Sequence, residues 1–145
     1  MSVQTLSPLQ RLSAIGQSVW IDFLSRDSIH GGHLQELIDQ DAVVGATSNP
    51  SIFQKAMSSG EAYEAQLREL DASRQSERAT ESSSTARAFW ALAQRDIEDA
   101  CNLFRPIWDA GQGRDGYVSL EVDPRLAYDT LETFREAMRL SLIHI

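Results

Sequence analysis

One stretch decides the fold of this chain: Gly116-Tyr117-Val118-Ser119-Leu120-Glu121-Val122-Asp123-Pro124. Side chains alternate across a strand, so its three aliphatic residues share one face and its polar residues share the other. Pro124 lacks the N–H that a ladder needs, and the predicted strand therefore ends before it. A helix is predicted over 126–138, because an apolar stripe with one threonine recurs every four residues, at Leu126, Thr130, Phe134 and Met138.

Two earlier stretches repeat this pattern of an apolar strand that ends in polar side chains. Residues 18–22 end in a carboxylate, and residues 43–50 end in Thr, Ser and Asn before a proline. In a barrel of parallel strands, residues at the carboxyl ends of the strands face the active site. We therefore expect a single polar floor at the strand ends, with Glu121 as the first candidate for chemistry. Its members are Asp22, Thr47, Asn49, Ser119 and Glu121.

Helical segments alternate with these strands. They are predicted at 8–15, 34–39, 52–57, 61–70 and 86–103, with Ser7 and Ser51 as N-caps. The polar segment 71–85 is predicted to be an exposed connection, and Pro106 is predicted to bend or end the long helix. Parallel strands joined by helices are the economical topology for this order of elements. The pattern fits both a doubly wound sheet and a (β/α)₈ barrel.

Composition excludes several classes of function. The 145 residues carry a formal net charge of −8, which argues against binding to a nucleic-acid backbone. A single cysteine, Cys101, allows neither an internal disulfide nor a cysteine zinc cluster. His30 and His33 flank two glycines and are interpreted as part of a solvated turn, so no metal site is predicted. No apolar run is long enough for a membrane span, and the N-terminus has no signal-peptide pattern. We expect a cytoplasmic protein.

The last six residues, 140–145, interrupt the predicted amphipathic helix, and the sequence there has neither a capping residue nor the glycine that commonly ends a helix. They read Leu-Ser-Leu-Ile-His-Ile, which is also the translation, in one frame, of a transposon end repeat used to prepare sequencing libraries. Our hypothesis is that 140–145 are a non-native scar and that 1–139 are the N-terminal part of a longer protein. The alternative is an ordinary apolar C-terminal segment.

Three segments carry a family resemblance in the order of the chain: 17–27 (QSVWIDFLSRD), 44–55 (VGATSNPSIFQK) and 115–130 (DGYVSLEVDPRLAYDT). Together they resemble transaldolase, in the longer bacterial type that also forms the front half of transaldolase–glucose-6-phosphate isomerase fusions. The similarity runs from about Leu9 to Arg139, apart from the Ser-rich connection. It implies an α/β fold, an incomplete (β/α)₈ TIM barrel with about the first three βα units and an N-terminal helix.

The resemblance also implies an activity, in which a dihydroxyacetone unit passes between sugar phosphates of the pentose phosphate pathway. The substrates would be sedoheptulose 7-phosphate and glyceraldehyde 3-phosphate, and the products erythrose 4-phosphate and fructose 6-phosphate, with no metal or organic cofactor. A lysine forms a Schiff base with the donor ketose, and the protonated imine accepts the electrons of the broken C–C bond. By the resemblance this lysine lies on the fourth strand, beyond Arg139. Lys55, the one lysine here, follows the second strand and does not replace it, so we expect the chain alone to be inactive.

Three residues match the family's functional positions. Asp22 matches the first-strand aspartate that handles a proton at the substrate hydroxyl. Asn49 matches the second-strand asparagine that hydrogen-bonds the dihydroxyacetone moiety. Glu121 matches the third-strand glutamate that moves protons through a bound water. Carboxylates suit such acid and base roles, because burial in a partly dry barrel mouth is able to raise the pKa of a carboxyl group in general.

Other interpretations of the same residues stay open. Asp22 and Glu121 are also expected at strand ends if each simply pairs with an arginine such as Arg26 or Arg125. Asn49 is also expected as an Asn-Pro turn former. Thr47 and Ser119 are interpreted either as substrate-binding residues or as polar fillers of the barrel interior. For the whole chain, the alternative is a non-enzymatic α/β interaction module or an inactive remnant.

Overall fold

A computed structural model describes residues 6–58, 61–74 and 81–141. Its sheet has three parallel strands in the order β1-β2-β3, with β1 at Val19–Ile21, β2 at Val43–Ala46 and β3 at Tyr117–Val118. Helices join these strands into successive βα units, which confirms the predicted α/β fold class. The arrangement is the beginning of a (β/α)₈ barrel, and the described strands do not close it.

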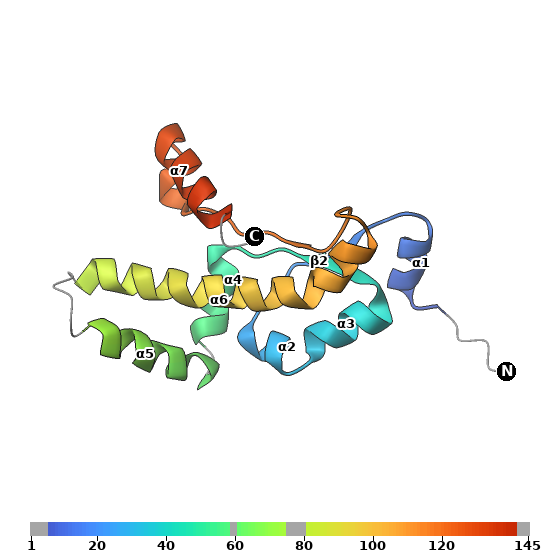
Figure 1. The fold of residues 1–145 in the computed structure, drawn as a ribbon, viewed down its shortest axis with the longest axis horizontal. Helices are drawn as coiled ribbons and strands as arrows, with labels where there is room; N and C mark the ends of the chain where they lie inside the picture. Colours follow the sequence, from blue (N-terminus) through green and yellow to red (C-terminus); the bar gives the residue numbers. More distant parts are fainter. Residues whose placement is uncertain (1–5, 59–60, 75–80, 142–145) are drawn as a thin grey trace.

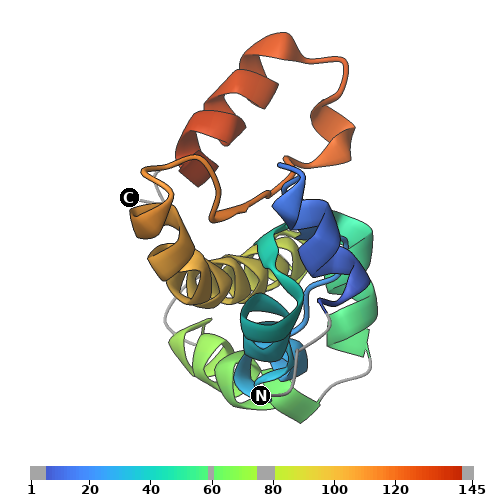
Figure 2. The same cartoon turned by 90° about the vertical axis from the view of Figure 1, so that its right-hand side faces the viewer.

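Helices precede, join and follow the strands (Figure 1). Over the described residues they are α1 (Pro8–Ala14), α2 (Arg26–His30), α3 (His33–Asp41), α4 (Pro50–Ser58), the 3₁₀ helix η1 (Glu61–Tyr63), α5 (Glu64–Arg74), α6 (Glu81–Ala110), the 3₁₀ helix η2 (Pro124–Leu126) and α7 (Thr130–Ser141). The long helix α6 packs on β2 and β3 and contacts α2 and α5. Figure 2 shows α7 projecting away from this body.

The core lies between the sheet and α6. One side of α6 buries Ala93, Ile97, Ala100 and Phe104 completely. These residues recur at intervals of three and four, the spacing that keeps them on one face of a helix. The other core residues come from the strands, the shorter helices and the connection between β1 and α2: Leu24, Ile29, Leu34, Val43, Ala46, Phe53 and Val118. Burial of this apolar surface holds α6 against the sheet.

Each strand is shorter than predicted. The predicted ranges are 18–22, 43–50 and 116–123, and the observed ranges are 19–21, 43–46 and 117–118. β3 ends early because its neighbour β2 stops at Ala46. One further ladder bond follows, from the Ser119 N–H to the Ala46 carbonyl. The residues beyond it leave the sheet and carry their side chains to its edge.

Two expectations about the middle of the chain need correction. Pro106 does not end the long helix, because α6 continues for another turn after it, and of the two predicted outcomes only a bend at this residue stays a prediction. The predicted exposed connection 71–85 is helical where it is described, since 71–74 belong to α5 and 81–85 belong to α6. Residues 75–80 lie outside the described residues. Serine and threonine favour helices only weakly, so residues 71–74 and 81–85 are helical as extensions of α5 and α6, whose other residues pack on the rest of the protein.

The stretch 126–138 differs from the single helix predicted there, both in where the helix begins and in which of its sides is buried. η2 ends at Leu126, and α7 begins only at Thr130. The side predicted to be buried is open, with Phe134 62% and Met138 50% exposed, whereas Leu140 is 4% exposed. The prediction assumed a further strand beside this helix, and the described part of the chain provides none. Since residues 142–145 lie outside the described part, the scar hypothesis for 140–145 stays a prediction.

α1 begins as predicted and leaves apolar side chains exposed near its end. The Ser7 side chain accepts from the Gln10 N–H, and the Gln10 side chain accepts in return from the Ser7 N–H, forming a capping box. Gly16, with φ at +87°, follows the helix end. Two apolar residues near the C-terminal end of α1, Leu12 and Ile15, are 44% and 74% exposed. Among the described elements, α1 packs chiefly on α3 and β1.

Candidate functional site

Polar side chains gather where the three parallel strands end. Asp22 follows the last residue of β1, Thr47 to Asn49 follow β2, and Ser119 follows β3. Because the strands run in the same direction and in chain order, these ends lie on one edge of the sheet. Two sets of hydrogen bonds, one at each strand junction, join them.

The first junction joins β1 to β2. The Thr47 N–H donates to the Ile21 carbonyl at 2.8 Å, which extends the ladder by one bond. The Thr47 hydroxyl donates to Oδ1 of Asp22 at 2.5 Å. Asp22 is exposed, so its carboxylate is held by Thr47 on one side and open to solvent. An exposed, oriented carboxylate at a strand end has the placement that proton transfer to a bound molecule needs.

The second junction joins β2 to β3. The Ser48 N–H donates to Oγ of Ser119 at 3.2 Å, and the Ser48 hydroxyl donates to the Ser119 carbonyl at 2.5 Å. We call this pair of hydrogen bonds, both donated by Ser48, the Ser48–Ser119 clamp. Ser48 is 1% exposed, so the clamp is shielded from water. No sequence motif marks Ser48 as functional, although alternation already places it on the face opposite Thr47 and Asn49.

Asn49 serves as the N-cap of α4. Its Oδ1 accepts from the Ile52 N–H at 3.0 Å, and its carbonyl accepts from the Phe53 N–H at 3.2 Å. The prediction that Ser51 caps this helix is therefore wrong. Capping uses the oxygen of the Asn49 side chain and fixes its orientation. The side-chain NH₂ group keeps its two donors for another acceptor.

Glu121 lies two residues beyond the clamp and is exposed. Within the described part of the chain, no hydrogen bond or ion pair involves its carboxylate. The two arginines considered as partners pair elsewhere: Arg26 with Asp96 at 2.8 Å and Arg125 with Asp123 at 2.5 Å. Hydrogen bonds from Arg125 hold the pKa of the Asp123 carboxyl below its ordinary value. Neither Asp22 nor Glu121 therefore forms an ion pair with Arg26 or Arg125, the two arginines that the alternative interpretation named.

His30 and His33 each lie near a single carboxylate, whereas a metal site needs several ligands around one point. His30 lies 2.9 Å from Asp99, and His33 lies 4.0 Å from Glu36. Over residues 6–58, 61–74 and 81–141, no three side chains of the His, Cys, Asp or Glu type come together to hold a metal ion. None of the helices that the structure describes has the length and hydropathy to cross a bilayer.

A pocket of about 430 Å³ lies on the other face of β3. Its walls include Cys101 and Trp108 of α6, Val118 and Leu120 of the β3 region, and Leu140 of α7. Burial raises the pKa of the Cys101 thiol. Alternation sends Ser119 and Glu121 to the opposite face, so the pocket is separate from the polar floor.

Comparisons with known proteins agree with the residue pattern. The sequence model of the transaldolase/fructose-6-phosphate aldolase family matches residues 19–144. The chain is 49% identical over 132 residues to the transaldolase of Mycobacterium marinum and 48% identical over 132 residues to that of Mycobacterium tuberculosis (strain H37Rv); each alignment covers 91% of this chain and 33% of the relative. It is 49% identical over 133 residues to the transaldolase of Parafrankia sp., covering 92% and 34%. The chain thus spans about a third of the length of the curated relatives it matches.

Proposed function

We propose, on the premise that the chain belongs to the transaldolase/fructose-6-phosphate aldolase family, that it forms the N-terminal third of a transaldolase and supplies the acid–base residues of the active site. The observation that carries this proposal is the pair of strand junctions. They bring Asp22, Asn49 and Ser119 to one edge of the sheet, with Glu121 following Ser119. Parallel βα barrels place their chemistry at this edge.

Each residue has a proposed part. Asp22 takes up or returns the proton of a substrate hydroxyl, and Thr47 holds one oxygen of its carboxylate. Asn49 donates its side-chain NH₂ to an oxygen of the dihydroxyacetone moiety, since its side-chain oxygen caps α4. Glu121, exposed and beyond the clamp, moves protons through a water during imine formation. Thr47 and Ser119 support these groups; their direct contact with substrate stays a prediction.

The complete enzyme would transfer a dihydroxyacetone unit between sugar phosphates in the pentose phosphate pathway through a lysine Schiff base, without a metal or organic cofactor. The chain's only lysine, Lys55, is exposed on α4, the helix that follows β2. A side chain on that helix does not belong to the strand-end floor. The Schiff-base lysine therefore comes from outside the 145 residues, and so do the groups that bind the substrate phosphate.

The test is a chimera in which residues 8–139 of this chain replace the matching third of the Mycobacterium marinum transaldolase. We expect the chimera to be active and Glu121→Gln to lower kcat by about 10²–10⁴ with a much smaller change in KM, because a positioned acid or base acts in the chemical step. Glu98→Gln, an exposed carboxylate on α6, is the matched control and should leave kcat unchanged. Unchanged turnover of the Glu121→Gln chimera would remove Glu121 from the mechanism. A folded but inactive chimera would support an interaction module or inactive remnant.

A further inference from the structure

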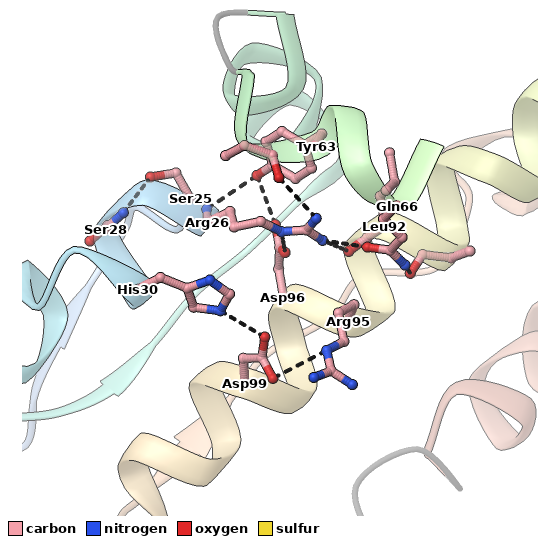
Figure 3. A network of polar contacts seen from close by, with 12 residues as sticks. Ser25, Arg26, Ser28, His30, Tyr63, Gln66, Leu92, Arg95, Asp96 and Asp99 are labelled. Atoms are coloured by element: carbon pink, nitrogen blue, oxygen red, sulfur yellow. Dashed lines mark hydrogen bonds and ion pairs between the residues drawn. The ribbon is translucent and has the colours of Figure 1, made fainter. Parts of the chain in front are cut away.

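A buried polar network is centred on Arg26, Asp96 and Tyr63 (Figure 3). Arg26 begins α2, the helix that follows the connection carrying Asp22. The Arg26 guanidinium donates from Nε to Oδ1 of Asp96 at 2.8 Å, and the Tyr63 hydroxyl donates to Oδ2 of the same carboxylate at 2.7 Å. The Arg26 backbone N–H donates to the Tyr63 hydroxyl at 3.2 Å, which closes the triangle. We call it the Arg26–Asp96–Tyr63 network. It ties α2, η1 and α6 together.

The network is buried and fully partnered. Asp96 has no exposed surface, and Arg26 is 7% exposed. The remaining guanidinium nitrogens donate to the Ala62 carbonyl at 3.3 Å and to Oε1 of Gln66 at 2.7 Å. The guanidinium carbon also lies 4.4 Å from the centre of the Tyr63 ring. Within the described residues, no buried side-chain nitrogen or oxygen lacks a hydrogen-bond partner.

The protonation states match this geometry. Burial raises the pKa of the Tyr63 phenol, so the hydroxyl keeps its proton and donates it to Asp96. Burial also raises the pKa of the Asp96 carboxyl, while hydrogen bonds from Tyr63 and Arg26 act in the opposite direction. A buried ion pair adds little net stability compared with apolar residues of the same volume. Such a pair does fix the relative orientation of the elements it joins, because each hydrogen bond has a preferred distance and angle between its donor and its acceptor.

The connection between β1 and α2 is short and is fixed at both ends. At the β1 end, Thr47 binds the Ile21 carbonyl and the Asp22 carboxylate. At the α2 end, Leu24 is fully buried and Arg26 is held by the network. Asp22 itself is exposed and has Thr47 as its side-chain partner. The path of its backbone therefore depends on both anchors.

We propose that the Arg26–Asp96–Tyr63 network is a positioning device for Asp22, an inference that rests on the proposed function. It holds the start of α2 against α6 and thereby sets the direction in which the connection presents the Asp22 carboxylate. Proton transfer needs the carboxylate within about 0.5 Å and 10–20° of the productive geometry. Arg26, Tyr63 and Asp96 act through Asp22 and do not touch substrate.

The test uses the same chimera with Tyr63→Phe, which keeps the ring and removes the hydroxyl that links the Arg26 N–H to Asp96. We expect kcat to fall by about tenfold to 10²-fold with KM nearly unchanged, since a small misplacement of a reacting group costs this much in rate. Ile97→Val, a fully buried neighbour of Asp96 on α6, is the matched control. It should lower the melting temperature to a similar degree and leave kcat unchanged.

A double-mutant cycle decides whether the effect passes through Asp22. In an Asp22→Asn chimera, adding Tyr63→Phe should cause no further loss of kcat, because residues that act as one unit are not additive. Additive losses would overturn the proposal. Full activity of Asp22→Asn alone would instead show that the proposed function is wrong for Asp22, which is a different failure.

Hydrogen exchange gives a readout that does not require activity. Mass spectrometry of the folded chimera should show about tenfold faster exchange over residues 22–26 in Tyr63→Phe, because the Arg26 N–H loses its acceptor and the connection loses one anchor. Ile97→Val should leave exchange over 22–26 unchanged. Equal exchange over 22–26 in the parent and Tyr63→Phe chimeras would overturn the proposal even if the chimera were inactive.

Discussion

At the scale of single residues, Ser48 connects two strand ends that carry proposed functional groups. Its neighbour Asn49 caps α4, and its partner Ser119 lies two residues before Glu121. Its backbone N–H and its hydroxyl both donate to Ser119, and the side chain is almost completely buried. We therefore expect Ser48 to affect function by setting the distance between the segments that carry Asn49 and Glu121, and not by contact with substrate.

Ser48→Ala in the chimera removes the hydroxyl that donates to the Ser119 carbonyl. We expect a loss of about 1–3 kcal/mol in the free energy of unfolding, because a buried acceptor is left without its donor. We also expect a lower kcat. Urea unfolding and steady-state kinetics measure the two effects. Ser28→Ala, at another buried serine, is the control and should leave kcat unchanged. If Ser48→Ala matched the parent chimera in both measurements, the clamp would have no role.

Cys101 offers a prediction about pH. Burial raises the pKa of its thiol, so a smaller fraction is thiolate at pH 7 than for a peptide cysteine. Iodoacetamide should therefore modify Cys101 in the folded chimera more slowly than it modifies a cysteine peptide, and the rate should keep rising with pH beyond the pH at which the peptide's rate levels off. Peptide mapping over a time course measures this rate. Labelling as fast as the peptide at pH 7 would contradict the burial of the thiol.

At the scale of elements, the periodicity of apolar residues predicted which helices and strands are present better than it predicted where each one ends or what it packs against. Alternation and the order of the strands were sufficient to place Asp22, Thr47 and Ser119 on one edge. The ion pair between Arg26 and Asp96 joins residues 70 positions apart, and no spacing rule connects them. The exposed side of α7 was predicted as buried because an amphipathic pattern shows that a helix has an apolar side and not which element covers it.

Pro106 tests the continuity of α6. Proline at this position lacks the N–H that would bond to the carbonyl four residues earlier and crowds the preceding turn. Pro106→Ala should therefore raise the free energy of unfolding of the chimera by about 1–3 kcal/mol, as measured by urea unfolding. Pro124→Ala is the control, because Pro124 stands at the first position of η2, where no bond is lost. Destabilisation by Pro106→Ala would indicate that the helix ends before this residue.

At the scale of the whole molecule, the described fold leaves apolar surface open. β1 and β3 are the edges of the described sheet, and α7 exposes Leu131, Phe134 and Met138 by 56%, 62% and 50%. Open edges and exposed apolar helix faces favour association with other chains. The same surfaces would be covered by further strands and helices in a closed barrel.

The 145-residue chain alone should therefore aggregate or melt without cooperativity, whereas the chimera should melt in one cooperative transition. Light scattering and calorimetry at matched concentrations distinguish the two. Leu131→Gln with Met138→Gln in the isolated chain should reduce its association, because both side chains are exposed. A monomeric chain with a sharp melt would show that the 145 residues form a self-contained domain.

The most direct measurement of the central claim is borohydride trapping with fructose 6-phosphate, followed by peptide mapping of the chimera and of the 145-residue chain. The claim is that this chain supplies acid–base residues and not the lysine that carries the Schiff base. We predict a reduced adduct on a lysine from the Mycobacterium marinum part of the chimera, no adduct on Lys55, and an unmodified 145-residue chain. An adduct on Lys55 in either protein would contradict the account.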